Sequence, residues 1–335
     1  MKHFIKYFVI FFLLVSCASS QNASPSIELT QIIKPPTSTA TIRPTATTVA
    51  APTRTATVAN PPTPIPVTAT PTQVPCDPHT ADYCVTDGHF ILQRPIKPPG
   101  NDSVDTTYRY ASTAEGTRDP HHGVEFLNKY GTPIYAAADG TVLFAGPDVE
   151  AIYSPWQNFY GNLVVIRHED DLYTLYAHLS KIDVKPGEIV SAGEKIGEVG
   201  QSGVAIGSHL HFEVRRGDDI QNYGATQNPE LWLVPEKDEF HVQYGVVMIS
   251  ILDENSQLQY AELTLGQALE SSDLTGKTYY LNTYVNDMAV GEENAAMSDL
   301  PPGRYRIALE HNGYLYERWV EVQSGKLTQV VIVVK

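Results

Sequence analysis

Cysteine is scarce in this chain, and its scarcity removes two classes of protein. Only three cysteines occur among 335 residues. That number excludes a disulfide-dense scaffold and a zinc cage built from four cysteines. Basic side chains are also few, at 23 against 38 acidic ones, which gives a formal net charge of −15. This balance speaks against nucleic acid as a partner and against attraction of the protein to anionic lipid, because both need a basic face.

The apolar run at the N-terminus is too short to cross a membrane. It extends from Tyr7 to Val15, whereas a bilayer core of ~30 Å requires about 20 residues. Lys2 and Lys6 precede it, as positive residues precede the apolar core of a signal peptide. We therefore expect residues 1–17 to be a signal peptide and the mature protein to lie outside the cytoplasm.

The end of this segment, Leu14-Val15-Ser16-Cys17, resembles the bacterial lipobox. The resemblance implies that Cys17 is lipidated and that the lipid alone anchors the protein to the membrane. The alternative is an ordinary secretory signal that is cut nearby. Residues 18–75 are dominated by Thr, Pro, Ala and Val. We expect them to form a disordered, polyproline-leaning tether, or a spacer without a preferred length.

Two cysteines remain for the folded part of the chain. Cys76 and Cys84 lie close together in the sequence, and we expect them to form a small disulfide loop in an oxidising compartment. The alternative is a metal site that includes His79 between them, but this spacing fits no common pattern of zinc ligands.

The rest of the chain predicts an all-β protein. From about residue 88 to 235, β-branched and aromatic runs alternate with Asp-Gly and short acidic turns, which are hairpin signals. We predict an antiparallel β-sheet domain over residues 76–238, followed by a small β-sandwich over residues 239–335. The run LPPGRY in the second part resembles a turn of carboxypeptidase-regulatory sandwiches. We interpret that part as an accessory domain for binding or spacing, or as structural support.

The eleven histidines are unevenly placed, and one pair lies in a strand-like run. His209 and His211 are two residues apart, so both side chains point to the same face of a strand. Two protonated imidazoles side by side would repel each other. A shared metal, or one ligand beside one base, resolves this conflict. The alternative is a pair of histidines on the surface of a strand.

A second cluster combines a histidine with a carboxylate. His121 and Glu125 are too far apart in a straight strand to share an ion, but Pro120 and Gly123 permit a bend between them. Two histidines and one glutamate would leave a fourth position for water, which is the pattern of catalytic zinc. We interpret His122 as a polar neighbour that does not bind metal.

Two further histidines each end a predicted strand. His178 follows an aromatic run in the same small domain, which makes it a candidate for the site. His168 precedes an acidic turn, and we expect it to be exposed and without function. The loop over residues 147–160 carries Trp156, Phe159 and Tyr160. These aromatic side chains would either line a substrate groove or pack against one another.

Four sequence runs follow one another between Arg94 and Val214. They are HHGVEF, GTPIYAAADGTVLFAG, GNLVVIRHEDDLYTLYAHLS and VKPGEIVSAGEKIGEVGQSGVAIGSHLHFEV. Together they resemble the lysostaphin-type (LytM-like) zinc metalloendopeptidases, which cut peptidoglycan cross-links. The resemblance implies that one Zn²⁺ ion is held by His121, Glu125 and His211, and that His178 and His209 are the paired catalytic histidines. It leaves the division of roles between these two histidines open.

The resemblance therefore implies a membrane-anchored, extracytoplasmic zinc endopeptidase that hydrolyses peptide bonds in peptidoglycan cross-links. Glu125 departs from the family pattern, which usually has aspartate there. It keeps the charge and the oxygen donors but adds a methylene, which leaves room for weakened or altered activity. One alternative is a weak or inactive relative that binds the cell wall or activates another wall hydrolase. The other is a peptidase that acts on proteins outside the wall.

Overall fold

The computed structural model describes residues 75–269, 272–284, 288 and 293–335. The chain divides into two compact units, Met1–Ala69 and Thr70–Lys335, and the described residues all belong to the second. The predicted signal peptide, the lipidation site Cys17 and nearly all of the predicted tether lie outside the described residues. Within the described part, no helix is both long enough and apolar enough to pass through a bilayer.

The all-β prediction is confirmed. Strands account for most of the regular structure described, and the helical segments are short 3-10 turns such as η1 (Tyr223–Ala225) and η2 (Pro229–Leu231). Most neighbouring strands pair antiparallel, and β12 with β18 is a parallel exception. Runs rich in Val, Ile, Tyr and Leu form these strands because such side chains pack well on a pleated, half-buried surface.

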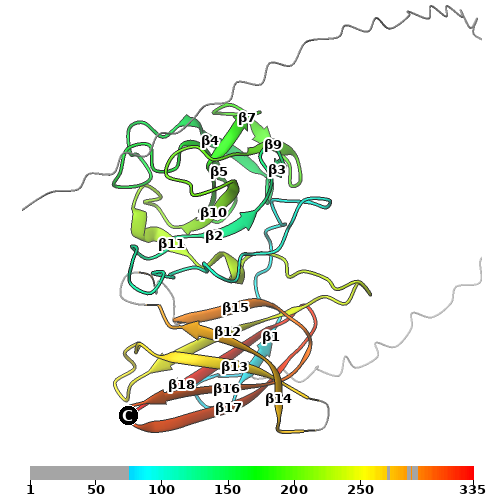
Figure 1. Ribbon diagram of the computed structural model, residues 1–335, viewed down its shortest axis with the longest axis vertical. Coiled ribbons are helices and arrows are strands. Elements are labelled where there is room, and N and C mark those ends of the chain that lie inside the picture. The colour runs from blue at the N-terminus through cyan, green and yellow to red at the C-terminus, as the bar shows by residue number, and fades with distance from the viewer. Residues whose placement is uncertain (1–74, 270–271, 285–287, 289–292) are drawn as a thin grey trace, which may run out of the picture. The chain divides into compact units, whose positions relative to one another are not determined.

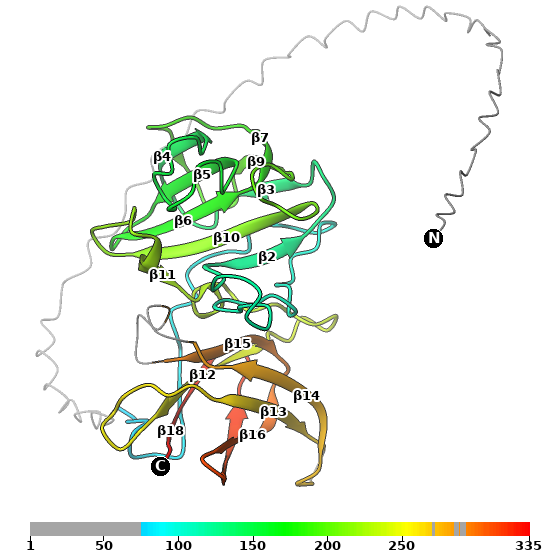
Figure 2. The same ribbon diagram turned by 60° about the vertical axis from the view of Figure 1, so that its left-hand side comes forward.

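A seven-stranded sheet carries the residues that the sequence singled out. Its strands are β2 (Val124–Leu127), β4 (Gly140–Pro147), β5 (Asn162–Arg167), β6 (Leu172–Ala177), β8 (Ile189–Val190), β10 (His209–Arg216) and β11 (Thr226–Gln227). The order is β11-β10-β6-β5-β4-β8, and β2 pairs with β10. Strand β10 therefore has β6 on one edge, and β2 and β11 on the other. Figure 2 shows β6, β10 and β2 side by side.

Strand β10 separates a hydrophobic core from a polar face. Leu210, Phe212 and Val214 are fully buried in the core. The alternate residues of β10 point to the opposite face, because successive side chains of a strand alternate. A smaller three-stranded sheet has the order β3 (Pro133–Tyr135), β9 (Lys195–Val199) and β7 (Leu179–Ile182).

The C-terminal residues form two four-stranded sheets (Figure 1). One has the order β1-β18-β12-β15 and contains β1 (Cys84–Thr86), β12 (Gly245–Leu252), β15 (Ala295–Leu300) and β18 (Leu327–Val333). The other has the order β14-β13-β16-β17 and contains β13 (Glu262–Ala268), β14 (Thr275–Asn282), β16 (Gly303–His311) and β17 (Tyr314–Val322). Buried apolar residues of both sheets form one core cluster.

One strand crosses the predicted domain boundary. Strand β1 lies within residues 76–238, but it pairs with β18, where Cys84 is opposite Gln329. Cys84 also forms a disulfide with Cys76. The core beneath the seven-stranded sheet likewise includes Val246 and Ala296 from the C-terminal part. The division at residue 238 stays a prediction, and packing is continuous across it.

Candidate metal centre

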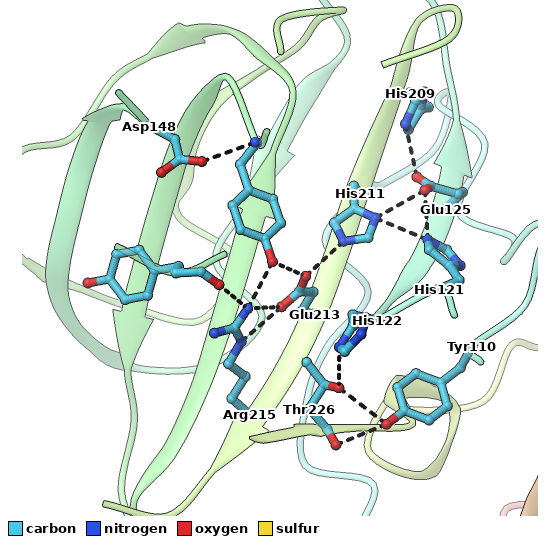
Figure 3. A network of polar contacts seen from close by, with 12 residues as sticks. Tyr110, His121, His122, Glu125, Asp148, His209, His211, Glu213, Arg215 and Thr226 are labelled. Carbon is cyan, nitrogen blue, oxygen red and sulfur yellow. Dashed lines mark hydrogen bonds and ion pairs between the residues drawn. The ribbon is translucent and has the colours of Figure 1, made fainter. Parts of the chain in front are cut away.

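Three side chains from neighbouring segments meet at one point on the polar face of β10. His121 lies just before β2, Glu125 lies in β2, and the sheet register places Glu125 opposite His211 in β10. His121 Nε2 is 2.9 Å from Glu125 Oε1, His211 Nδ1 is 3.0 Å from the same oxygen, and the two nitrogens are 3.1 Å apart. All three residues are buried, and their side chains point toward one another (Figure 3). The bend expected from Pro120 and Gly123 thus brings together the residues expected to share an ion.

The spacing of these atoms matches the size of a zinc site. Bonds of about 2.0 Å to a tetrahedral zinc ion place its ligand atoms about 3.3 Å apart. The three distances among the ligand atoms, 2.9, 3.0 and 3.1 Å, are slightly shorter than this edge. A small outward movement of the side chains would therefore create room for the ion.

In His121 and His211, one ring nitrogen (the inner nitrogen) points toward Glu125 and the other (the outer nitrogen) points away from it. Both outer nitrogens face oxygens that can only accept a hydrogen bond. His121 Nδ1 is 3.2 Å from the carbonyl oxygen of Arg109, and His211 Nε2 is 3.0 Å from Glu213 Oε1. Each neutral ring therefore carries its proton on the outer nitrogen. The inner nitrogens then direct lone pairs at each other and at the carboxylate of Glu125. Such a convergence needs positive charge, which either an added proton or a metal cation supplies.

The charges around His211 show how strongly this point attracts a positive charge. Burial opposes protonation of His211, but the carboxylates of Glu125 and Glu213 outweigh it and raise the pKa of His211 to about 10. Burial also opposes ionisation of Glu125, but His211 and His121 hold its pKa well below the usual value. Glu125 Oε2 is buried without a hydrogen-bond partner. The donor set and this unpartnered oxygen fit a divalent cation such as Zn²⁺.

A buried polar network fixes His211 from the side opposite the cluster (Figure 3). Glu213 accepts hydrogen bonds from Tyr160 Oη at 2.5 Å and from Arg215 Nε at 2.9 Å. Burial opposes the charge of Glu213, but Arg215 and His211 lower its pKa to about 2. An ionised carboxylate therefore orients the imidazole of His211, as carboxylates commonly orient metal-binding histidines.

The sequence also contains a pattern that indicates part of this network, although our predictions above did not include it. His209, His211, Glu213 and Arg215 are spaced two apart, and the alternation that places the two histidines on one face extends to Glu213 and Arg215. Tyr160 comes from the loop before β5, and no local pattern links it to β10.

His178 and His209 form a second pair beside the cluster. Their ring centroids are 4.9 Å apart. His178 joins β6 to β7 with a φ of 64°, a strained conformation for a residue other than glycine, and such strain is concentrated at functional sites. His178 Nδ1 donates to the carbonyl of Ser202 at 2.9 Å, and His209 Nδ1 faces the carbonyl of Gly207 at 3.2 Å. In its neutral form His178 therefore has its Nε2 available as a base, whereas both ring nitrogens of His209 lie near acceptor oxygens.

Both of these histidines are neutral near pH 7. Burial, with a contribution from the charge of His211, lowers the pKa of His178 to about 3. Burial also lowers the pKa of His209, although Glu125 opposes that shift. His209 Nε2 lies 3.2 Å from Glu125 Oε2. The longer side chain at position 125 thus reaches the two inner nitrogens with one oxygen and approaches His209 with the other.

A cavity of about 710 Å³ opens over these residues. All five predicted site residues, four histidines and Glu125, line it. Trp156 and Phe159 from the loop over residues 147–160 also line it, as do Val204 and Ile206 from the segment between β9 and β10. Tyr160 is instead fully buried against Glu213. The cavity therefore combines an apolar wall with the polar cluster, as substrate sites commonly do.

The prediction that His168 is exposed is wrong. It is 8% exposed, its Nδ1 faces the carbonyl of Asp139 at 2.8 Å, and its Nε2 faces Thr174 Oγ1 at 2.8 Å. The acidic turn after it reverses the chain at once, so His168 folds back against β6 instead of facing solvent. His122 binds Thr226 at 3.1 Å and stacks on Tyr223, and it is not one of the three converging residues.

Comparison with known proteins identifies the part of the chain that holds this site. Residues 119–228 match Peptidase family M23. The peptidoglycan DD-endopeptidase ShyA of Vibrio cholerae is 36% identical over 144 residues, which are 40% of this chain and 31% of that protein. The DD-carboxypeptidase/endopeptidase Mpg of Neisseria meningitidis is 42% identical over 95 residues, which are 28% of this chain and 20% of that protein.

Among solved structures, a zinc containing peptidase from Vibrio cholerae is 31% identical, covers 39% of each chain and has a TM-score of 0.32. The chain thus spans only 31% and 20% of the lengths of the two curated relatives. The matched segment includes the three converging residues and both neighbouring histidines. The segment that holds the candidate metal centre is therefore the part of the chain that is similar to Peptidase family M23.

Proposed function

We propose that this protein is a zinc endopeptidase that hydrolyses peptide bonds in peptidoglycan cross-links. The observation that carries the proposal is the meeting of His121 Nε2, Glu125 Oε1 and His211 Nδ1 in one buried cluster. The names of the relatives support the substrate, because ShyA is described as a peptidoglycan DD-endopeptidase. Peptidoglycan peptides are therefore the proposed partners of the cavity.

The chain's own residues divide the chemistry among them. His121, Glu125 and His211 would hold the ion, and Glu213 would orient His211. When bound, Zn²⁺ supplies Lewis acidity that polarises a peptide carbonyl and lowers the pKa of water. His209 takes the proton of the attacking water, since burial favours its neutral form and its Nε2 borders Glu125. His178 stabilises the developing oxyanion or assists the departure of the amine.

We also propose that the protein acts outside the cytoplasm and is anchored by lipid at Cys17. The N-terminal positive residues, the short apolar run and the lipobox-like sequence support this location. A tether over residues 18–75 would let the peptidase domain reach away from the membrane.

The test combines metal analysis with digestion of isolated cell walls. The purified protein should contain about one zinc per chain. It should convert the cross-linked muropeptides of intact sacculi into uncross-linked ones until a chelator is added. His211→Ala should remove both the zinc and the hydrolysis. His209→Ala should keep the metal and lose turnover by at least about 100-fold, because it removes a general base.

An exposed histidine provides the matched control. His241 is exposed and lies far along the chain from the cluster, so His241→Ala should retain zinc and activity. Retention of full hydrolysis by His209→Ala would contradict the assignment of the base. Zinc binding without loss of cross-linked muropeptides from sacculi would favour a wall-binding protein or a peptidase of other proteins.

A further inference from the structure

The metal ligand His121 is held by a short segment that precedes it. His121 donates its backbone N–H to the carbonyl of Ser112 at 3.0 Å, and its own carbonyl accepts from the N–H of Ala111 at 2.7 Å. Its Nδ1 donates to the carbonyl of Arg109. The position of His121 is therefore set, through three hydrogen bonds, by residues 109–112, which we call the support segment.

The support segment is anchored to the C-terminal sheets by a buried ion pair. Arg109 Nη1 contacts Glu230 Oε2 at 2.5 Å, and the side chain of Glu230 is completely buried. The same oxygen accepts from the backbone N–H of Ser298 at 2.8 Å and from its hydroxyl at 2.9 Å. Ser298 belongs to β15, which is a strand of the C-terminal sandwich.

A second anchor lies at the next residue of the segment. Tyr110 is 4% exposed, and its hydroxyl faces the carbonyls of Thr226 at 2.9 Å and Met288 at 3.1 Å. Its ring packs edge-on against Tyr284, with 5.1 Å between the ring centroids. Met288 and Tyr284 both lie beyond β14 in the C-terminal part of the chain. Adjacent residues of the support segment thus bind the sandwich through independent contacts.

We infer that the C-terminal β-sandwich positions the metal ligand His121, through Arg109, Glu230 and Ser298, and so forms part of the metal centre's support. Arg109 is a positioning residue, because its carbonyl orients the ring of His121 while its guanidinium binds Glu230. This inference rests on the proposed zinc site. Residues that orient metal-binding side chains commonly change metal affinity by about 10- to 100-fold when they are altered.

A matched ion pair of the same contact region lacks the link to the cluster. Arg94 Nη2 binds Asp299 at 2.6 and 2.7 Å, and the two side chains are 8% and 19% exposed. Asp299 is the neighbour of Ser298 in β15. No described hydrogen bond joins Arg94 to His121, Glu125 or His211, so Arg94→Gln loosens the same contact without touching a proposed ligand.

The experiment measures zinc affinity in the full-length chain, by competition with a chromogenic chelator, together with thermal unfolding. Arg109→Gln keeps the backbone carbonyl but removes the ion pair, and it should weaken zinc binding about 10-fold or more. Arg109→Lys should restore part of this loss, because it keeps the charge. Arg94→Gln should lower the unfolding temperature while its zinc affinity stays within about twofold of the unaltered chain, because no ligand is displaced.

A milder change on the sandwich side keeps the test decisive if Arg109→Gln fails to fold. Ser298→Ala removes one of the two donors that Ser298 gives to Glu230, and it should weaken zinc binding in the same direction but by less. In the double variant the two effects should be less than additive, because both act through Glu230. The inference is overturned if Arg109→Lys and Ser298→Ala both bind zinc as tightly as the unaltered chain. It is also overturned if Arg94→Gln loses as much affinity as the Arg109 variants.

The unaltered chain separates this inference from the proposed function. Failure of the unaltered protein to bind zinc would contradict the zinc site itself. Tight binding by the unaltered protein and by every variant would leave the zinc site intact and reject only the role of the sandwich.

Discussion

At the scale of single residues, the site is built from pairs of groups whose charges depend on each other. Glu125 and Glu213 lie on two sides of His211, and each accepts from one of its ring nitrogens. In the absence of a metal cation, a second proton on His211 gives its ring a positive charge, which partly neutralises the negative charges of these two buried carboxylates. A zinc ion would replace that proton, because a metal ligand must present a lone pair.

This exchange predicts how zinc affinity depends on pH. The pKa of His211 is raised from 6.5 to about 10 in the folded, metal-free protein. Binding of zinc therefore releases one proton, and the apparent affinity should rise about tenfold per pH unit between roughly pH 7 and 9. A competition titration at several pH values measures the slope. An affinity that does not change with pH would contradict the role of His211 as a ligand.

The raised pKa of His211 also affects the stability of the metal-free protein, which should fall with rising pH whereas the zinc affinity rises. A folded-state pKa above the unfolded value of 6.5 stabilises the metal-free protein fully below that pH. The contribution is then lost as the pH rises toward 10. His178, with a lowered pKa of about 3, is neutral in both states in this range and does not change the slope. The metal-free protein should therefore lose stability in the pH range where it gains affinity for zinc.

At the scale of elements, the sequence predicted which side chains share one face of a strand, but it did not predict the contacts that other segments make with that face. The alternation in β10 was enough to place His209 and His211 on one face. The same rule reaches Glu213, but only the fold shows that Tyr160 donates to it. The exposure of His168 was mispredicted because a local pattern does not show which strand covers a side chain.

The close approach of β2 to β10 depends on Gly123, and this predicts how a side chain at position 123 would affect the two strands. A Cβ at Gly123 would lie 2.5 Å from the carbonyl oxygen of Phe212 and 3.0 Å from His211 Cε1. Gly123→Ala should therefore push β2 away from β10, cost about 1–3 kcal/mol of unfolding free energy and weaken zinc binding. Chemical denaturation and metal competition measure the two effects.

The control for this variant is a glycine in another strand of the same sheet. A Cβ at Gly146 in β4 would meet only Phe144, at 3.8 Å. Gly146→Ala should leave zinc affinity unchanged. If Gly123→Ala bound zinc as tightly as the Gly146 variant, the close contact between β2 and β10 would not be what positions the cluster.

At the scale of the whole molecule, the second compact unit is continuous where the sequence suggested a boundary. Strand β1 precedes the segment that matches Peptidase family M23 but pairs with β18 near the C-terminus. Such a pairing joins residues more than two hundred positions apart, and no local pattern of charge or hydrophobicity could reveal it. The predicted boundary at residue 238 lies beside a turn at residues 239–240, while the core continues across it.

This continuity predicts cooperative unfolding. The core beneath the seven-stranded sheet contains Leu92 and Leu233 together with Val246, Ala296 and Leu327. A chain that ends at residue 238 would expose the first two residues and leave β1 without a partner strand. We therefore expect one calorimetric transition for the second unit in the full-length protein, and no cooperative transition for the chain that ends at residue 238. Two separate transitions, or a shortened chain that unfolds cooperatively at the temperature of the full-length protein, would show that the sandwich does not support the seven-stranded sheet.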